Sequence, residues 1–310
     1  MNNIICIAGP TASGKTALAV QLAKELNGEV ISCDSMQVYR RMDIGTAKPT
    51  IDEREGIAHH MLDVAEPEED FSVSKYCDLA TPILEDIICR GKTAIIAGGT
   101  GLYMDALIKG NDFAPFPATG HRQRLEEKLA AEGLEALTAE LAAVDPEAAE
   151  RAQRNPRRII RALEVYYETG ETITAHNLKT QSLPPRYAPL WLGLDFDPRS
   201  LLYERIDRRV SIMLEAGLEQ EIRALLASGL DKRCTALQAI GYKEFLAALD
   251  GQCTMEEAAD AVRQASRRYA KRQLTWFRRN KAIHWLTRRT GDQTDEIIAQ
   301  ARQIICNFDN

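Results

Sequence analysis

The chain has 310 residues, of which 45% are hydrophobic and 27% are charged, and its formal net charge is −6. These values are ordinary for a soluble globular protein with one large domain, or with a core and a smaller domain. No apolar run approaches the roughly 20 residues of a membrane-spanning helix, and no signal-peptide pattern precedes Ile4. We therefore expect a cytoplasmic protein that makes no contact with a membrane.

The charge is unevenly distributed along this acidic chain. Residues 263–289 contain ten basic side chains and no Asp or Glu, and residues 151–161 contain five arginines and again no acid. Local patches decide the binding of polyanions more than the net charge does. Two basic surfaces on an acidic protein therefore keep nucleic acid among the expected partners.

The N-terminal segment predicts a phosphate-binding loop. An apolar strand at 4–8 precedes the complete G-x-x-x-x-G-K-T pattern Gly9-Pro10-Thr11-Ala12-Ser13-Gly14-Lys15-Thr16, and a helical pattern follows it and ends near Asn27-Gly28. In this order, backbone N–H groups and the helix N-terminus surround a di- or triphosphate. Lys15 would reach the terminal phosphoryl oxygens, and Thr16 would hold Mg²⁺.

Strands and helices then alternate along the chain. Further apolar runs of strand type lie at 29–33, 93–97, 190–194 and 282–286, and helical patterns lie at 74–89, 201–227 and 255–279. Residues 45–67 are loop-like. Near-continuous apolar strands alternating with helices predict an α/β fold with a parallel sheet covered by helices on both faces.

The middle of the chain changes character. Residues 122–180 are rich in Ala, Glu, Leu and Arg with no strand pattern, and Pro184-Pro185 follows as a hinge or linker. This predicts a phosphate-loop core formed by 1–121 and 187–310, interrupted by an all-helical insertion at 122–186.

Three candidate site segments follow predicted strands, at Gly9, Asp34 and Gly98. Open α/β sheets bind ligands at the carboxyl ends of their strands. From the residue type alone, Asp34 fits two roles equally well: a Mg²⁺-holding acid of a nucleotide hydrolase, or a base beside the phosphate loop. Thr100 follows Gly98-Gly99 and fits either a helix N-cap or a group that bonds phosphate or a base.

Several segments carry a resemblance to one family. The phosphate loop and residues 34–49 (DSMQVYRRMDIGTAKP) closely resemble the tRNA dimethylallyltransferases, also called tRNA isopentenyltransferases. The resemblance continues, in family order, through His59-His60 and the segments 98–103 (GGTGLY), 155–165 (NPRRIIRALEV), 240–244 (IGYKE) and 270–277 (AKRQLTWF). These blocks span most of the chain.

The resemblance implies a reaction and its partners. The dimethylallyl group of dimethylallyl diphosphate would move to N6 of adenosine 37 in a tRNA anticodon stem-loop, with diphosphate leaving and Mg²⁺ as cofactor. It favours Asp34 as the base that accepts an N6–H hydrogen bond, gives Thr100 a role in the site, and assigns a functional arginine to Arg122. We expect the protein to act as a monomer.

The resemblance and the basic stretches together indicate where tRNA binds. It implies contacts from Asp34, Ser35, Met36 and Gln37, and from Arg157, Arg158, Ile159, Ile160 and Arg161 in the insertion. On the late helix, 100° per residue places an apolar face beside two basic stripes, one containing Arg267 and Lys271 and the other Arg272. A phosphate backbone fits such a surface, although solvated helix faces would show the same residues.

Three alternatives remain open. A free-nucleotide isopentenyltransferase would share the loop but generally lacks the long helical insertion. A small-molecule kinase or RNA-stimulated ATPase would need a different setting for Asp34, because the third strand ends in Gly-Gly and not in an acid. A non-catalytic tRNA-binding module would not need a complete phosphate loop. His59-His60 fits a structural polar network better than a metal site.

Overall fold

The computed structural model describes residues 3–110, 119–182 and 184–308. The chain divides into two compact units: a core unit of Met1–Gly110 with Arg186–Asn310, and a helical unit of Asn111–Pro185. Among the described residues, no helix has both the length and the apolarity to cross a bilayer. The described residues include all seven cysteines, and none of them forms a disulfide.

The core unit contains a parallel sheet of six strands among the described residues. In sheet order they are β3 (His59–His60), β2 (Gly28–Cys33), β4 (Thr93–Gly98), β1 (Ile4–Ala8), β5 (Leu190–Phe196) and β6 (Ile283–Arg288). Ile5 of β1 lies opposite Ile95 on one side and Leu190 on the other. β1, β2, β4 and β5 are almost wholly buried and mostly apolar, as strands covered on both faces are, and the predicted parallel α/β core is confirmed.

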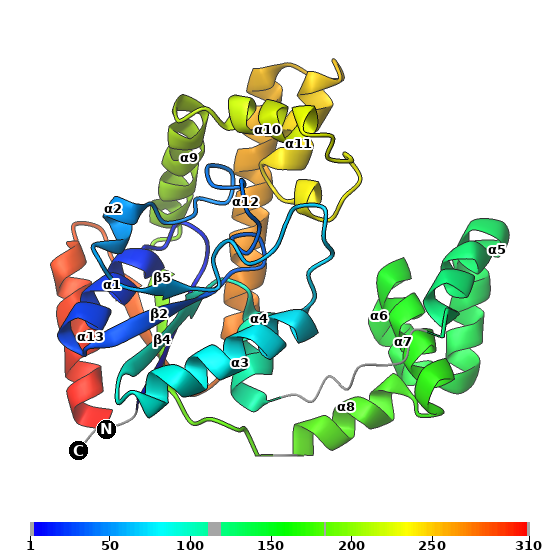
Figure 1. The fold of residues 1–310 in the computed structure, drawn as a ribbon, viewed down its shortest axis with the longest axis horizontal. Helices are drawn as coiled ribbons and strands as arrows, with labels where there is room; N and C mark the ends of the chain where they lie inside the picture. The colour runs from blue at the N-terminus through cyan, green and yellow to red at the C-terminus, as the bar shows by residue number, and fades with distance from the viewer. Residues whose placement is uncertain (1–2, 111–118, 183, 309–310) are drawn as a thin grey trace. The chain divides into compact units, whose positions relative to one another are not determined.

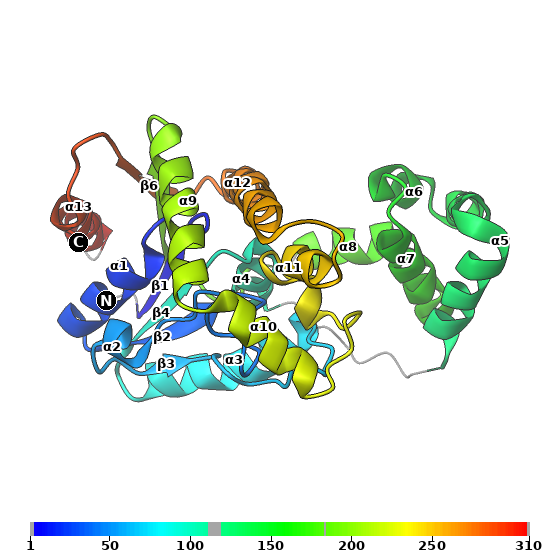
Figure 2. The same ribbon diagram turned by 90° about the horizontal axis from the view of Figure 1, so that it is seen from above.

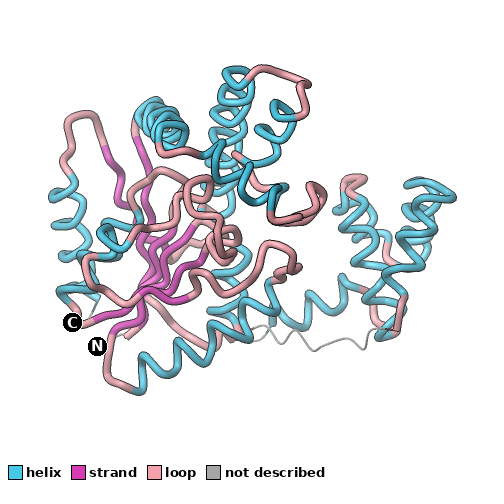
Figure 3. Tube along the Cα trace, turned by 45° about the horizontal axis from the view of Figure 1, so that its top comes forward, coloured by secondary structure: helices cyan, strands magenta, loops and turns pink. Residues whose placement is uncertain are grey.

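Helices cover both faces of this sheet. The helices described in the core unit are α1 (Lys15–Glu25), α2 (Ile51–Arg54), α3 (Val73–Cys89), α4 (Gly101–Lys109), α9 (Ser200–Glu215), α10 (Leu218–Ala227), α11 (Tyr242–Leu249), α12 (Met255–Phe277) and α13 (Thr294–Phe308), with a short 3₁₀ helix at Ala236–Gln238. Figure 1 shows their order along the chain. Figure 3 shows the strands enclosed between helices in the core unit.

The two faces of the sheet are packed by different helices. On one face, Ile5 and Ile7 of β1 contact a core that includes Leu22 of α1 and Ile297 of α13. On the other face, α3 and α4 lie against β2 and β4, and α12 packs on α4 (Figure 2). The Tyr76 hydroxyl of α3 donates to the Ser32 carbonyl at 3.0 Å and fixes α3 to β2. This leaves the carboxyl ends of β1, β2 and β4 facing α9 and α12.

Two local predictions are wrong. Residues 45–67, predicted as loop, contain the edge strand β3 and the short helix α2. The predicted helix at 201–227 is two helices, α9 and α10, because Gly217 adopts φ +98° and stops the first one. A left-handed residue cannot continue an α-helix, and glycine adopts this conformation without a Cβ penalty.

The helical unit has its own apolar core. It contains α5 (His121–Val144), α6 (Pro146–Ala152), α7 (Pro156–Thr169) and α8 (Ile173–Ser182). Leu137 and Leu141 of α5 pack against Leu163 of α7. Asp145 caps α6, its Oδ1 accepting from the Ala148 N–H at 3.0 Å, and its Oδ2 accepts from the Thr174 N–H of α8 at 3.0 Å. One buried carboxylate therefore joins the ends of two helices.

Candidate active site

The phosphate loop has the backbone shape that anion binding requires. β1 ends at Ala8 and α1 begins at Lys15, and between them Ala12 and Gly14 have φ of +62° and +93°. Left-handed residues in such a turn direct successive N–H groups toward one concave surface at the helix N-terminus. The Ser13 hydroxyl is buried and lacks a hydrogen-bond partner within the described chain. The loop therefore offers several donors to one anion.

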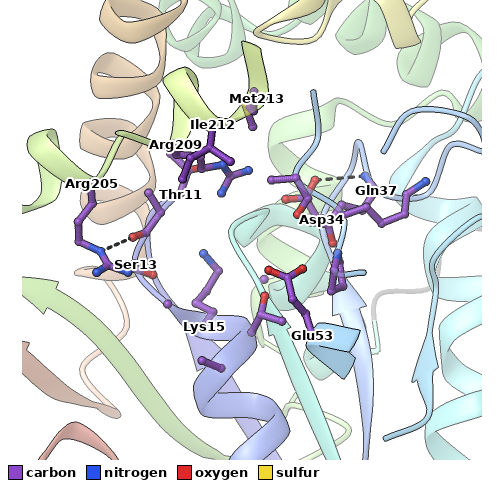
Figure 4. A pocket seen from close by; sticks show the side chains of 18 of the residues that line it. Thr11, Ser13, Lys15, Asp34, Gln37, Glu53, Arg205, Arg209, Ile212 and Met213 are labelled. Carbon is purple, nitrogen blue, oxygen red and sulfur yellow. Dashed lines mark hydrogen bonds between the residues drawn. The ribbon is translucent and has the colours of Figure 1, made fainter. Parts of the chain in front are cut away.

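A cavity of about 610 Å³ opens beside the loop, entirely within the core unit. Its walls include the loop residues Thr11 to Thr16, Asp34 and Gln37 after β2, and Arg205 and Arg209 of α9. Figure 4 shows Lys15 and Arg205 on one side and Asp34 and Gln37 on the other. The structure thus brings the predicted phosphate loop and the predicted base together; Gly9 and Pro10 connect the loop to β1.

Cations outnumber carboxylates around this cavity. The lining cations are Lys15, Lys48, Arg205, Arg208 and Arg209, against the carboxylates Asp34, Asp43 and Glu53. Lys48 is neutralised by Asp43, since its Nζ lies 2.6 Å from Oδ1. The remaining excess of positive charge favours a ligand of high negative charge, such as a diphosphate.

Lys15 lies across the phosphate loop. Its Nζ donates to the Pro10 carbonyl at 2.7 Å. The pKa of Lys15 is lowered to about 8, mainly by burial; the charge of Asp34 raises it and that of Arg209 lowers it. An anion bound in the loop would further stabilise the charged form of this amine, so the site is electrostatically suited to phosphate oxygens.

Two arginines of α9 complete the positive wall, and the sequence motifs did not reveal them. Arg205 Nε donates to the Ala12 carbonyl at 2.8 Å, and Arg209 Nη2 donates to the Thr46 carbonyl at 3.1 Å. Burial lowers the pKa of both guanidinium groups. They remain charged, because a guanidinium does not lose its proton at ordinary pH, so both contribute to anion binding.

Asp34 is oriented by its own turn. Its Oδ1 accepts hydrogen bonds from the backbone N–H groups of Met36 at 2.9 Å and Gln37 at 3.4 Å. Its Oδ2 has no hydrogen-bond partner among the residues that the structure describes. One oxygen therefore fixes the side chain, and the other is available to a ligand in the cavity.

Thr100 connects two strand ends. Its Oγ1 accepts from the Ser35 N–H at 3.0 Å, while α4 starts at Gly101 without a capping bond from this side chain. Thr100 therefore occupies the N-cap position of α4, but its hydroxyl bonds to the backbone after β2 and does not cap the helix. Gly98 has no room for a side chain, because a Cβ there would lie 1.9 Å from the Cys33 carbonyl oxygen. The glycines after β4 let the two strand ends meet, and Thr100 then holds the backbone beside Asp34.

Gln273 of α12 is a second feature that the motifs did not reveal. Its Oε1 accepts from the Thr11 N–H at 2.9 Å, and its Nε2 donates to the Gly99 carbonyl at 3.0 Å. Tyr269, one turn earlier, also lines the cavity, and burial raises its pKa to about 12. This helix therefore fixes the phosphate loop to the turn after β4 and keeps a protonated phenol at the site.

The segment after Asp34 supports the site through its backbone and one amide. Ser35, Met36 and Gln37 form the turn that follows β2. Gln37 lines the cavity, and its Nε2 donates to the Ala47 carbonyl at 3.1 Å. These contacts give the three residues a positioning role, and their predicted contact with tRNA stays a prediction.

The basic stripes of α12 differ in their charge balance. Arg267 pairs with Asp207 of α9, with 3.0 Å between Nε and Oδ1. Lys271 and Arg272 are exposed and have no carboxylate partner in the described parts of the chain, and the Arg272 guanidinium lies 5.6 Å from the Tyr269 ring centroid. Lys271 and Arg272 therefore present uncompensated charge, whereas the charge of Arg267 is balanced within the protein.

The helical unit corrects one prediction. Ile159 and Ile160 of α7 are 0% and 4% exposed and belong to the apolar core of this unit, so their side chains are not available to RNA. Arg157, Arg158 and Arg161 lie on the exposed face of the same helix. The 3.6-residue period explains this split, because it places neighbouring residues on different sides of α7.

Arg122 lies in the first turn of α5, within the helical unit. Its Nε is 3.3 Å from Glu126, and its Nη1 is 3.6 Å from Glu164 of α7. Glu164 also accepts from Arg161 at 2.8 Å. The charge of Arg122 is thus shared with the carboxylates of Glu126 and Glu164, and the catalytic role of Arg122 stays a prediction.

The predicted structural role of His59-His60 agrees with the contacts. His60 Nε2 lies 2.8 Å from Glu29, and His59 Nδ1 lies 2.9 Å from the Ile57 carbonyl. Burial lowers the pKa of His59. In the described part of the chain, no three His, Cys, Asp or Glu side chains are grouped as metal ligands.

Comparisons with known proteins identify the family. Residues 37–280 match the model described as IPP transferase. The tRNA dimethylallyltransferase of Acetivibrio thermocellus is 43% identical over 310 residues, which cover 99% of both chains. The crystal structure of the full-length tRNA isopentenylpyrophosphate transferase from Bacillus halodurans gives a TM-score of 0.74 at 43% identity, covering 99% of this chain and 96% of that one. A crystallographic structure of a eukaryotic dimethylallyltransferase acting on tRNA gives a TM-score of 0.81 at 29% identity. The match covers 99% of this chain and 80% of that one. This chain therefore belongs to the IPP transferase family, together with the tRNA dimethylallyltransferases.

Proposed function

We propose that this protein transfers the dimethylallyl group of dimethylallyl diphosphate to N6 of adenosine 37 in tRNA, with diphosphate as the leaving group. The observation that carries the proposal is one cavity that joins the phosphate loop to the strand-end carboxylate Asp34. The family supplies the reaction class, because relatives over the full chain are named tRNA dimethylallyltransferases.

The positive wall suits the leaving group. When the bond between the allylic carbon and the diphosphate oxygen breaks, negative charge develops on the diphosphate. Lys15, Arg205, Arg209 and the loop N–H groups are already in place to stabilise that charge. Fixed donors of this kind act without reorganisation during the reaction, which lowers the barrier for bond cleavage.

Asp34 suits the acceptor. The exocyclic amine of adenine is a weak nucleophile, since its lone pair is conjugated into the ring. As the bond from N6 to the allylic carbon forms and the bond to diphosphate breaks, one N6 proton would pass to Oδ2 of Asp34, while Oδ1 stays bonded to the Met36 N–H. The adenine must leave the anticodon-loop stack to reach this carboxylate.

The residues of the cavity fit Mg²⁺ as the cofactor. Mg²⁺ binds hydroxyl, carboxylate and phosphate oxygens and retains water, and it rarely needs a cluster of protein ligands. Thr16 offers a hydroxyl in the first turn of α1, and Glu53 and Asp34 line the same cavity. Bound Mg²⁺ would neutralise charge on the diphosphate, with Thr16 as its protein ligand.

The tRNA would be bound by exposed cations on both units. Arg157, Arg158 and Arg161 of α7 and Lys271 and Arg272 of α12 would contact its phosphates. Arg122 would contribute to the reaction when tRNA is bound. We propose that the protein acts as a monomer.

Product mass analysis tests the proposal against its alternatives. The protein would be mixed with Mg²⁺, dimethylallyl diphosphate and a tRNA with adenosines at 36, 37 and 38, and separately with AMP. One dimethylallyl group on adenosine 37, with no modified AMP, would support the proposal. Modified AMP would indicate a free-nucleotide enzyme, and ATP hydrolysis without any transfer would overturn prenyl transfer.

A further inference from the structure

One wall of the cavity is a loop with little regular structure to hold it. Residues 43–48, which we call the 43–48 loop, contribute Asp43, Ile44, Ala47 and Lys48 to the lining. They lie outside any helix or strand, and residues 44–47 form turns. A loop of this kind keeps one shape only if other elements satisfy its backbone groups.

Glu221 of α10 satisfies three of those groups. Its Oε2 accepts from the N–H groups of Asp43 at 2.8 Å and Ile44 at 2.7 Å. Its Oε1 accepts from the Gly45 N–H at 3.1 Å and from the Tyr242 hydroxyl at 2.7 Å. A carboxylate has about four lone-pair positions, so this side chain is fully used by the loop and by α11.

Tyr242 fits tightly beneath the same loop. A Cβ on Gly45 would lie 2.5 Å from the Tyr242 ring, so only glycine lets the loop reach Glu221. Burial, and then the negative charge of Glu221, raise the pKa of Tyr242, so its hydroxyl stays a donor. The arrangement depends on Gly45, Tyr242 and Glu221 together.

The other side of the loop holds two cavity residues. The Thr46 carbonyl accepts from Arg209 Nη2 at 3.1 Å, and the Ala47 carbonyl accepts from Gln37 Nε2 at 3.1 Å. Gln37 follows Asp34 in its turn. A displacement of the 43–48 loop would therefore move two groups together: the Arg209 guanidinium, which would face the diphosphate, and the Gln37 amide, which lies beside Asp34.

We propose that Glu221 is a positioning residue for prenyl transfer: by binding three backbone N–H groups of the 43–48 loop, it sets the position of Arg209 toward the diphosphate. The inference rests on the proposed function. Glu221 itself does not line the cavity, and it acts through the Thr46 carbonyl.

The test compares Glu221→Gln with Glu219→Gln. Glutamine keeps the size of Glu221 but turns one acceptor oxygen into a donor that faces backbone N–H groups or the Tyr242 hydroxyl. Glu219 lies on the same helix and pairs only with Arg223 among the described residues, so its variant is the matched control. Transfer to tRNA would be measured as kcat and KM, and binding of inorganic diphosphate would be measured by calorimetry without tRNA.

We expect Glu221→Gln to lower kcat by about tenfold to a hundredfold and to weaken diphosphate binding, because a displaced guanidinium loses alignment with the leaving group. The KM for tRNA should change little, and Glu219→Gln should match the unmodified protein. If Glu221 has only a structural role, Glu221→Gln will lower the unfolding midpoint but leave the diphosphate affinity of the folded protein unchanged. That result would overturn the inference.

Tyr242→Phe keeps the test decisive if Glu221→Gln does not fold. It removes one donor to Glu221 and leaves the three backbone bonds, so a smaller loss in kcat and diphosphate affinity is expected. Unchanged values in a folded Tyr242→Phe protein would then overturn the inference. Absence of transfer by the unmodified protein, with diphosphate still bound, would instead contradict the proposed function.

Discussion

Replacement of Gln273 by leucine should weaken both the fold and the site. This side chain is 5% exposed and joins backbone groups of the two loops that follow the neighbouring strands β1 and β4. Leucine has a similar volume, so the change removes hydrogen bonds without leaving a large cavity. It would leave the Gly99 carbonyl and the Thr11 N–H without their protein partner.

The magnitude follows from those two groups. A buried polar group without a partner costs about 1–3 kcal/mol. The Thr11 N–H lies at the partly exposed cavity wall and takes the low end of that range, so we expect a loss of about 2–4 kcal/mol in the free energy of unfolding. The phosphate loop also loses its tie to α12, and the KM for dimethylallyl diphosphate should rise about tenfold, equivalent to about 1.4 kcal/mol.

Urea unfolding, followed by tryptophan fluorescence, measures the change in the free energy of unfolding. The three tryptophans, Trp191, Trp276 and Trp285, all lie in the core unit, so the signal reports this unit and not the helical one. Gln264→Leu, an exposed change on the same helix, is the control and should stay within about 0.5 kcal/mol. A Gln273→Leu protein that unfolds at the control's urea concentration would refute the reasoning.

Three further changes test the site. Asp34→Asn keeps an oxygen for the turn but removes the base, so kcat should fall by about a hundredfold or more while tRNA affinity, measured by filter binding, stays unchanged. The pKa of Lys15 is lowered to about 8, so the amine is charged below that pH and neutral above it. Diphosphate affinity, measured by calorimetry, should therefore fall as pH rises through about 8. Lys15→Arg should remove this pH dependence, because an arginine stays charged. Arg268 and Arg272 are exposed and have no carboxylate partner in the described chain. Replacing either one by alanine should reduce the slope of log affinity for tRNA against log salt concentration by about one. Arg263→Ala should have a smaller effect, because Arg263 is paired with Asp260.

Local sequence patterns predicted the parts of the fold that depend on local physics. Buried parallel strands are continuously apolar, so the strands from Ile4 to Ala8 and from Leu190 to Phe196 were visible as runs. The phosphate loop was visible because its glycines and Lys15 occur at fixed spacing in one short segment. The two-residue strand at His59-His60 was not visible in the sequence, because two residues are too few to show a periodicity.

The missed site residues share a different property. Gln273 meets Thr11 across 262 residues of chain, and Arg205 meets Ala12 across 193. Their partners are backbone carbonyls and N–H groups, which carry no side-chain identity, so no residue pairing in the sequence indicates these contacts. Gly217 was different: a glycine inside a helical pattern is a signal for a break, and it marks the end of α9.

The arrangement of the site along the chain explains how a helical unit can be inserted into this fold. The chain leaves and re-enters the core unit at one point, since the N–H groups of Arg186 and Tyr187 donate to the carbonyls of Lys109 and Ile108 at 3.2 and 3.1 Å. Within the described chain, no residue between Gly110 and Arg186 lines the cavity. The described residues of the insertion therefore contribute nothing to the cavity wall. The residues that would bind the diphosphate thus belong to the core unit, and under the proposed function the exposed arginines of α7 would add a surface for RNA without altering them.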